Sequence, residues 1–374
     1  MEKDEILVIY GEDPAEMAYK LAGEASLAEL IGDRNKRIGL KPNLVVARPA
    51  SDGATTHPEI ARGIIRYLHE QGFRTPAILE GSWVGARTAE AFPRCGYTRL
   101  AGDTGAELIN TQTDKAQFYD CRGMKIEICD SAMAIDFMIN LPVLKGHCQT
   151  RLTCTLKNNK GIIPDREKRR FHSLGLHKPI AHLNTRVRND FIVVDGICGD
   201  PDFEEGGNPV YAGRVFAARD PVLCDAWAAV QMGYDPAGIS YIGLAEKLGV
   251  GLGDPHKAVV RELSPPHTPY QGSKSGFQRP RPGRLVQQLS PLIREDGACS
   301  ACYAALIFAL ARMNRNETGR LKEPLCIGQG FRGKGGSAGI GRCTAGFTAS
   351  VKGCPPSGAD ILDFLRDVTL RKGK

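Results

Sequence analysis

Four cysteines near the carboxyl end of the 374-residue chain have a spacing that is typical of metal ligation. Cys299 and Cys302 form a CxxC pair. Cys343 closes a glycine-rich run, and Cys354 opens the sequence CPP. Two thiolates three positions apart can face the same metal, and a proline after a ligating cysteine turns the chain away from the sulfur atoms. We therefore expect a [4Fe–4S] cluster bound by these four residues, with Cys326 as an alternative ligand.

A structural zinc ion is the alternative for four thiolates, although such sites usually pair two CxxC knuckles and this chain has one. The glycine-rich run also contains GxGxxG at Gly328, Gly330 and Gly333. A dinucleotide site needs a strand before this motif and a helix after it. The preceding LCI is short, and the following KGGSAGIG is a poor helix former. We interpret the run as backbone that wraps a cluster, and we expect no nucleotide cofactor.

A second set of polar residues falls where buried strands are expected to end, which is where an open α/β sheet places its ligand. The substrate-binding candidates are Lys41, Asn43, Thr56, His57, Glu80, Ser82, Lys145, Thr150, Lys157, Asn158 and Asp195. Lys145, Lys157 and Lys160 would bind the carboxylate or phosphate of a small anionic molecule. His147 or His172 would supply a proton, because imidazole titrates near neutral pH. Lys160 is the third catalytic candidate, and each residue singly could also be a cap, a turn residue or a solvated side chain.

The elements that must position these residues have the pattern of an α/β fold. Short apolar runs alternate with helical patterns over the first 260 residues, which predicts a mostly parallel sheet with flanking helices. Strands are expected at 6–10, 37–45, 75–81, 136–144, 191–197 and 214–220, and helices at 55–73 and 221–232. Thr56 and Glu59 have the spacing of a capping box at the start of the first helix.

Residues 264–285 are rich in proline, glycine and serine and have no apolar period, so they are the expected linker. An α/β domain is expected over 1–263. A small α-rich, loop-rich iron–sulfur module is expected over 286–374, with helices in CSACYAALIFALARM and DILDFLRDV.

The composition excludes several classes of protein. No 18-residue apolar run and no signal-peptide pattern is present, so we expect a cytoplasmic protein without a membrane partner. The net charge of +7 is not gathered into a block with interleaved aromatic residues, so no nucleic-acid partner is expected. Twelve cysteines in a reducing compartment are expected to be packing residues or metal ligands rather than disulfides.

Several segments together resemble the domain-of-unknown-function 362 family over roughly residues 35–250. They are KPNLV, TTHPE, EGS, LPVLKGH, TLKNNKGIIPDREKRRFH and VVDGICGDPDFEEGGNP. The resemblance implies an α/β domain, and members often carry an iron–sulfur module. CxxC and GCPP fit that cluster-bearing branch but depart from its repeated CxxCxxCxxxC pattern. The chain also looks distantly similar to the lactate racemase family, whose members bind a nickel cofactor with His and Lys.

Three functions are consistent with these patterns. The first is an iron–sulfur oxidoreductase that acts on a small anionic substrate at the strand ends of the α/β domain. The second is a lyase or desulfidase in which the cluster is a Lewis acid, with Cys302, Cys343 and Cys354 as its three ligands. The third is an electron-transfer or cluster-carrier protein that docks on a partner.

Overall fold

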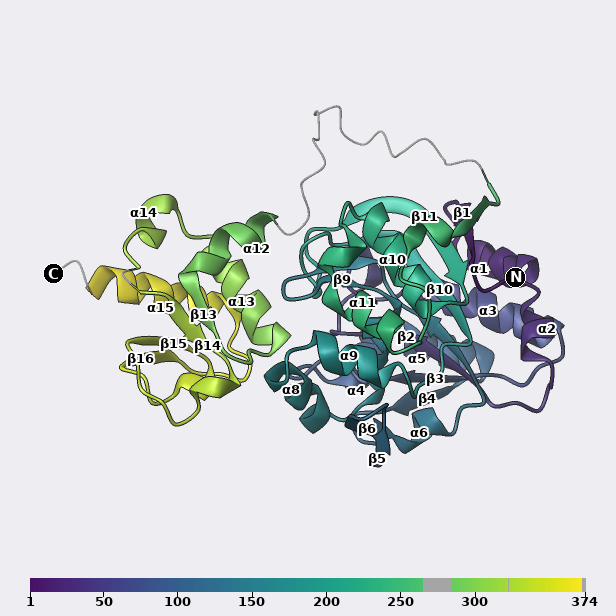
Figure 1. Cartoon of the computed structure of the whole chain (residues 1–374), viewed down its shortest axis with the longest axis horizontal. Helices are drawn as coiled ribbons and strands as arrows, with labels where there is room; N and C mark the ends of the chain where they lie inside the picture. Colours follow the sequence, from purple (N-terminus) through teal and green to yellow (C-terminus); the bar gives the residue numbers. More distant parts are fainter. Residues whose placement is uncertain (265–283, 322, 372–374) are drawn as a thin grey trace. The chain divides into compact units, whose positions relative to one another are not determined.

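A computed structural model of the chain describes residues 1–264, 284–321 and 323–371. The chain forms two units (Figure 1). The larger comprises Met1–Lys168 and His177–Pro280, and the smaller comprises Arg169–Leu176 and Arg281–Lys374. The predicted linker, 264–285, lies almost wholly outside the described residues.

An eight-stranded sheet forms the centre of the larger unit (Figure 1). Its strands are β1 (Glu5–Tyr10), β2 (Ile38–Pro42), β3 (Ala77–Glu80), β4 (Glu107–Asn110), β7 (Phe137–Leu141), β10 (Phe191–Gly199), β11 (Val210–Ala218) and β12 (Val259–Glu262). They lie in the order β12-β1-β11-β10-β7-β2-β3-β4. Neighbours are parallel except that β11 runs antiparallel to both β1 and β10. The predicted α/β class with a mostly parallel sheet is confirmed.

Burial explains why the central strands form. Strands β2, β3 and β7 are buried at every position, because helices cover both faces of a mostly parallel sheet. Two hairpins lie outside the main sheet, formed by β5 (Ala116–Asp120) with β6 (Lys125–Cys129), and by β8 (Lys145–His147) with β9 (Arg151–Thr153). The second hairpin carries several of the predicted site residues.

Helices surround this sheet. They are α1 (Pro14–Glu24), α2 (Leu27–Ile31), α3 (Pro58–Glu70), α4 (Thr88–Arg94), α5 (Tyr97–Thr104), α6 (Asp130–Met133), α7 (Thr155–Asn158), α9 (His177–Leu183), α10 (Pro221–Gln231) and α11 (Ser240–Lys247). Helix α8 (Asp165–Ser173) spans the boundary between the two units, and the 3₁₀ turn η2 (Asn159–Ile162) follows α7. Among the described residues, no helix is both long and apolar enough to cross a bilayer.

The start of α3 differs from the predicted capping box. The N-cap residue is His57, and its side chain does not cap the helix. Thr56 Oγ1 instead donates to the Leu141 carbonyl at 2.7 Å and accepts the Asn43 N–H at 2.8 Å. The capping-box prediction is therefore wrong, because Thr56 joins the helix start to the ends of β2 and β7.

The smaller unit contains a four-stranded parallel sheet in the order β13-β14-β15-β16. Its strands are β13 (Ile293–Glu295), β14 (Leu325–Ile327), β15 (Ala338–Ile340) and β16 (Ala349–Val351), and its helices are α12 (Arg284–Leu289), α13 (Ser300–Leu310), α14 (Arg315–Thr318) and α15 (Gly358–Arg371). Ile361 and Leu365 of α15 are fully buried, and α15 packs on α13. The sequence predicted helices and loops here. The sheet was missed because three-residue strands are too short to show an alternating pattern.

Candidate functional site

The ends of β2 and β3 hold a buried ion pair between Lys41 and Glu80. The distance from Lys41 Nζ to Glu80 Oε2 is 2.6 Å, and the two side chains are 0% and 3% exposed. Lys41 Nζ also donates to the Pro42 carbonyl at 2.7 Å. Burial lowers the pKa of Lys41, and the charge of Glu80 opposes that shift. These two predicted substrate-binding residues are thus bonded to each other.

The loop after β3 is fixed by Ser82 and by a lysine that the sequence analysis did not select. Ser82 Oγ donates to the Leu44 carbonyl at 2.7 Å. Lys168 Nζ donates to the carbonyls of Gly81 and Ser82 at 3.1 and 2.8 Å. Lys168 is 3% exposed and also pairs with Asp165 at 3.1 Å, so it ties this loop to the beginning of α8.

Lys145, the first residue of β8, joins three distant segments of the chain. Its ammonium donates to Asn43 Oδ1 at 3.2 Å, to the Glu204 carbonyl at 2.8 Å and to the Ala54 carbonyl. Burial, followed by the charge of Lys157, lowers the pKa of Lys145 to about 7, and the charge of Glu204 acts in the opposite direction. Three oxygen atoms match the three N–H groups of an ammonium ion, so Lys145 is fully bonded within the protein.

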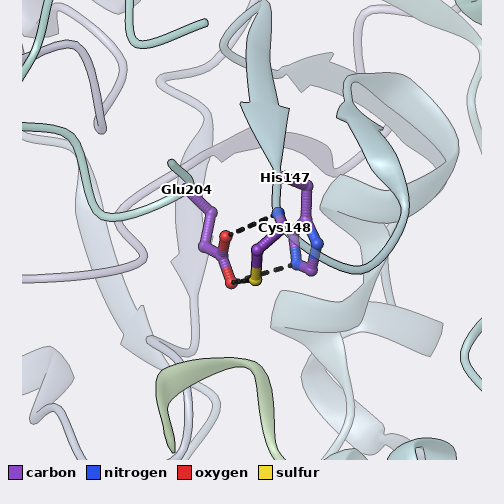
Figure 2. A group of neighbouring side chains, drawn as sticks. All are labelled: His147, Cys148 and Glu204. Carbon is purple, nitrogen blue, oxygen red and sulfur yellow. Dashed lines mark hydrogen bonds and ion pairs between the residues drawn. The ribbon is translucent and has the colours of Figure 1, made fainter. Parts of the chain in front are cut away.

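His147, Cys148 and Glu204 form a compact group in which His147 and Glu204 are buried and Cys148 is half-buried (Figure 2). Glu204 Oε1 lies 3.2 Å from His147 Nε2 and 3.5 Å from Cys148 Sγ, and Glu204 Oε2 accepts the Cys148 N–H at 3.3 Å. One ligand atom from each residue lies within 4.8 Å of the other two, so the group could hold a metal ion. The sequence analysis selected His147 but not the other two residues.

Backbone hydrogen bonds determine which ring nitrogen of His147 carries the proton when the imidazole is neutral. Nδ1 of His147 accepts the N–H groups of Gln149 at 3.0 Å and Thr150 at 3.2 Å. A neutral imidazole whose Nδ1 is an acceptor carries its proton on Nε2, which here faces Glu204. A metal ion on Nε2 would require the opposite tautomer, with Nδ1–H donating to an acceptor. The backbone contacts of Nδ1 therefore favour a proton on Nε2, which lies at ion-pair distance from Glu204, over a metal ion at that nitrogen.

Lys157, on α7, has fewer hydrogen-bond partners within the described structure than Lys41 or Lys145. Thr153 Oγ1, at 3.2 Å, is its one hydrogen-bond partner in the part of the chain that the structure describes. Burial lowers the pKa of Lys157 to about 8, against the opposing charges of Glu204 and Cys148. Burial and the charge of Glu204 also raise the pKa of Glu205. Several groups that change charge near neutral pH therefore lie around Glu204.

His57 and Asp195 form a second charged pair at the same edge of the sheet. The backbone N–H of His57 donates to Asp195 Oδ2 at 2.8 Å, and ring Nδ1 lies 2.8 Å from the same oxygen. Burial acts to lower the pKa of His57, but the charge and hydrogen bond of Asp195 outweigh it and raise the pKa. Asp195 is fully buried. The carboxylate of Asp195 thus places negative charge at the start of α3, where the helix dipole favours it.

The other predicted residues of the larger unit differ in their surroundings. Asn158 Nδ2 donates to Asn140 Oδ1 at 2.7 Å and to the Lys41 carbonyl at 3.0 Å, so it belongs to a buried amide network. Thr150 Oγ1 donates to the Leu152 carbonyl at 3.1 Å. Lys160 is half-buried on η2. His172, on α8, belongs to the smaller unit.

A second compact group, Cys154, Cys224 and Asp225, was not predicted as a site. Its three residues are fully buried, and their ligand atoms also lie within 4.8 Å of one another. The two oxygens of Asp225 accept the N–H groups of Thr155 at 2.7 Å and Leu156 at 3.2 Å. Burial raises the pKa of Asp225 to about 7, and these hydrogen bonds oppose the shift. We therefore assign this group a structural role, in which Asp225 accepts the first N–H groups of α7.

In the smaller unit, three of the predicted cluster ligands follow the carboxyl ends of parallel strands. Cys299 follows β13 and is the N-cap residue of α13, and Cys302 lies one turn into that helix. Cys343 and Cys354 follow β15 and β16. Two backbone hydrogen bonds tie these last loops together, from Gly341 N–H to the Val351 carbonyl at 3.0 Å and from Arg342 N–H to the Gly353 carbonyl at 2.8 Å.

Electrostatic interactions show that these four thiols share one environment. Burial raises the pKa of Cys302, and the negative charges of Cys299, Cys354 and Cys343 raise it further. Arg332 donates a hydrogen bond to Cys343, which raises the pKa of the guanidinium. Gln329 Nε2 lies 3.9 Å from Cys299 Sγ. The sulfur atoms therefore have positive and polar donors around them.

Cys326 lies apart from this group. It is a residue of β14, so its side chain projects from a face of the sheet rather than from the loops at its edge. Burial raises the pKa of Cys326, and the charged groups that affect it among the described residues are Arg294 and Glu323. The alternative ligand of the sequence analysis is thus separated from the other four cysteines by its place in the strand.

The spacing of the four thiols bears on the choice of metal. A tetrahedral zinc ion with bonds of about 2.3 Å would hold its sulfur atoms roughly 3.8 Å apart. Among the described residues, no three of these sulfur atoms lie within 4.8 Å of one another. In this conformation the sulfur atoms are therefore not arranged at the spacing of a bound zinc ion.

Two glycines allow the loops to approach each other. Gly341 has φ +81°, and a Cβ atom there would lie 3.5 Å from Pro356 Cδ and 3.9 Å from Cys302 Sγ. Gly353 has φ +130°, and a Cβ atom there would lie 2.5 Å from Pro356 Cα. Other residues would be strained at both positions, so the glycines are required for this arrangement of loops.

The family match found by comparison with known proteins lies mostly in the larger unit. Residues 38–230, which belong to the larger unit except for Arg169–Leu176, match the family model described as a domain of unknown function (DUF362). The thylakoid-associated protein sll1697 of Synechocystis is 25% identical over 230 residues, which cover 57% of this chain and 68% of that protein.

Two solved structures show a limited likeness. The lactate racemase apoprotein of Thermoanaerobacterium thermosaccharolyticum has a TM-score of 0.39 at 11% identity, and the match covers 59% of this chain and 55% of that chain. A Thermotoga maritima structural-genomics target has a TM-score of 0.37 at 13% identity, with 64% and 60% covered. The match thus spans less than two thirds of either solved chain. Because the family model covers more than half of the sequence, this chain belongs to the domain-of-unknown-function 362 family, as the resemblance predicted.

Proposed function

We propose that this protein is an iron–sulfur oxidoreductase that acts on a small anionic molecule held by the larger unit. In this proposal Cys299, Cys302, Cys343 and Cys354 bind a [4Fe–4S] cluster. The observation that carries it is the shared environment of four thiols, three on loops that follow parallel strands and one in the first turn of α13. A cluster holds its cysteine ligands farther apart than a single ion does and supplies an electron-accepting group.

The surroundings of the thiols suit such a cluster. The hydrogen bond from Arg332 to Cys343 and the approach of Gln329 to Cys299 would stabilise negative charge on sulfur. Glycine-rich backbone leaves N–H groups able to reach the inorganic sulfides.

The larger unit supports binding of a small anion through Lys157. Its ammonium is bonded to one neutral hydroxyl group, whereas Lys41 is paired with a carboxylate and Lys145 with three oxygen atoms. An anionic group beside Lys157 would stabilise its charged form. His147 Nε2 and Glu204 Oε1 lie 3.2 Å apart in the same region, so the pair could give a proton to the bound molecule or remove one.

Anaerobic purification and single Cys→Ser variants test the cluster. We expect about four iron and four sulfide per chain, and a reduced sample with the electron paramagnetic resonance signal of a [4Fe–4S]⁺ centre. Each of C299S, C302S, C343S and C354S should lose most of the iron, whereas the matched variant C326S should keep it. Zinc in place of iron in the purified protein would contradict the proposal. If C299S keeps its cluster while C302S, C343S and C354S lose theirs, the result would favour the alternative function, a lyase or desulfidase whose cluster has three cysteine ligands.

A further inference from the structure

The loops that carry the cluster ligands have a one-sided charge. From residue 324 to residue 359 the sequence contains Arg332, Lys334, Arg342 and Lys352 and no aspartate or glutamate. All four side chains are exposed. Lys334 lies 3.7 Å from Asp296, but both side chains are more than half exposed, so this pair neutralises little of the charge.

An open hollow of about 500 Å³ lies on these loops beside Cys354. Arg342 and Lys352 line it together with Val351 and Ala345, so it has cationic side chains and an apolar floor. Cys354 is exposed, whereas Cys302 on α13 is shielded by the unit. Among the four thiols, Cys354 is therefore the one through which a cluster would be closest to a partner.

We infer that this cationic hollow is the docking surface for an acidic electron-transfer protein, one with carboxylates around its own redox group. The inference rests on the proposed iron–sulfur function, and it assigns the surface and the charge of the partner. Arg342 and Lys352 line this hollow, whereas Lys334 lines another one beside Asp296, so the cations are not all gathered at one point, which fits an extended acidic face better than a single phosphate. Small, charge-steered contacts are typical of electron-transfer encounters.

The test is a binding measurement on the full-length, cluster-containing protein. An oxidised acidic flavodoxin is titrated by calorimetry at low ionic strength, and basic cytochrome c serves as the opposite-charge probe. We expect flavodoxin to bind and cytochrome c not to bind. The double variant R342E/K352E should weaken flavodoxin binding at least about tenfold, and 0.5 M salt should abolish the difference. The matched variant R320E changes an exposed cation outside residues 324–359 and should bind like the wild type.

Iron content and the reduced-cluster spectrum are measured on the same samples, so the inference and the proposed function fail in different ways. A wild-type protein that forms no cluster overturns both. A protein with an intact cluster that does not bind flavodoxin, or whose affinity is equal in R342E/K352E and wild type, overturns the docking surface alone. An equal loss of affinity in R320E also overturns it, because net charge would then explain the binding.

Discussion

Replacement of Lys41 by methionine tests whether the ion pair at the ends of β2 and β3 stabilises the fold. Lys41→Met would leave Glu80 buried, with the N–H groups of Leu44 and Gly81 as its donors at 3.2 and 2.7 Å. Removing one partner of a buried pair typically costs about 3–5 kcal/mol. For a unit of this size 1 kcal/mol corresponds to roughly 2 °C, so we expect the melting temperature of the larger unit to fall by about 6–10 °C.

Calorimetry of three further variants separates the interaction energy between Lys41 and Glu80 from the effects of the single substitutions. Glu80→Gln should also destabilise, but the double variant K41M/E80Q should be more stable than the sum of the single effects by at least about 2 kcal/mol. The control is R37M, which removes the exposed pair between Arg37 and Glu107 at 3.1 Å and should cost less than about 1 kcal/mol. A K41M protein that melts within about 1 °C of the wild type would refute this reasoning and return Lys41 to the candidate anion-binding residues.

Three more predictions concern the other parts of the structure. Asp195 raises the pKa of His57 in the folded protein. The stabilisation from this pair should therefore be complete below about pH 6.5 and be lost as pH rises through the pKa of His57 in the folded state. D195N should remove that pH dependence from the melting temperature. Gly353→Ala should lose cluster iron, because the new Cβ would lie 2.5 Å from Pro356 Cα at a positive φ. G333A, with φ +74° and open space around it, should bear the strain but keep the iron, and equal iron in both variants would contradict the prediction. Chelation of iron should lower the calorimetric transition of the smaller unit and leave that of the larger unit in place; a shift in both would show that the cluster supports the whole chain.

The sequence predicted the elements whose burial is continuous. Strands such as β7 and β10 are mostly apolar and buried along nearly their whole length, and both were expected close to their observed bounds. Strands β4 and β12 were missed, because their residues are exposed or half-buried and their pattern resembles that of a loop. In the smaller unit the strands have three residues each, and their pairing with distant neighbours leaves no local signal.

For the candidate site, the sequence indicated which residues lie at strand ends but not which residues contact one another. Strand-end residues such as Lys41 and Glu80 could be listed, but their pairing follows from β2 and β3 being adjacent in the sheet. Glu204 was missed although the quoted family segment contains it, because its contact with Cys148 joins residues 56 positions apart. Likewise, only the folded chain brings Asp195 to the N–H of His57, 138 residues earlier. Such contacts depend on the order of the strands, which local pattern does not give.

The place of β1 in the sheet also affects how the chain is made. Both neighbours of β1, the antiparallel β11 and the parallel β12, lie far downstream. At a synthesis rate of 5–20 residues per second, roughly 200 further residues take on the order of 10–40 s to appear. Until then β1 is an apolar segment of the ribosome-bound chain without its neighbouring strands β11 and β12. A nascent chain of this protein should therefore be a substrate for chaperones that shield β1 during translation.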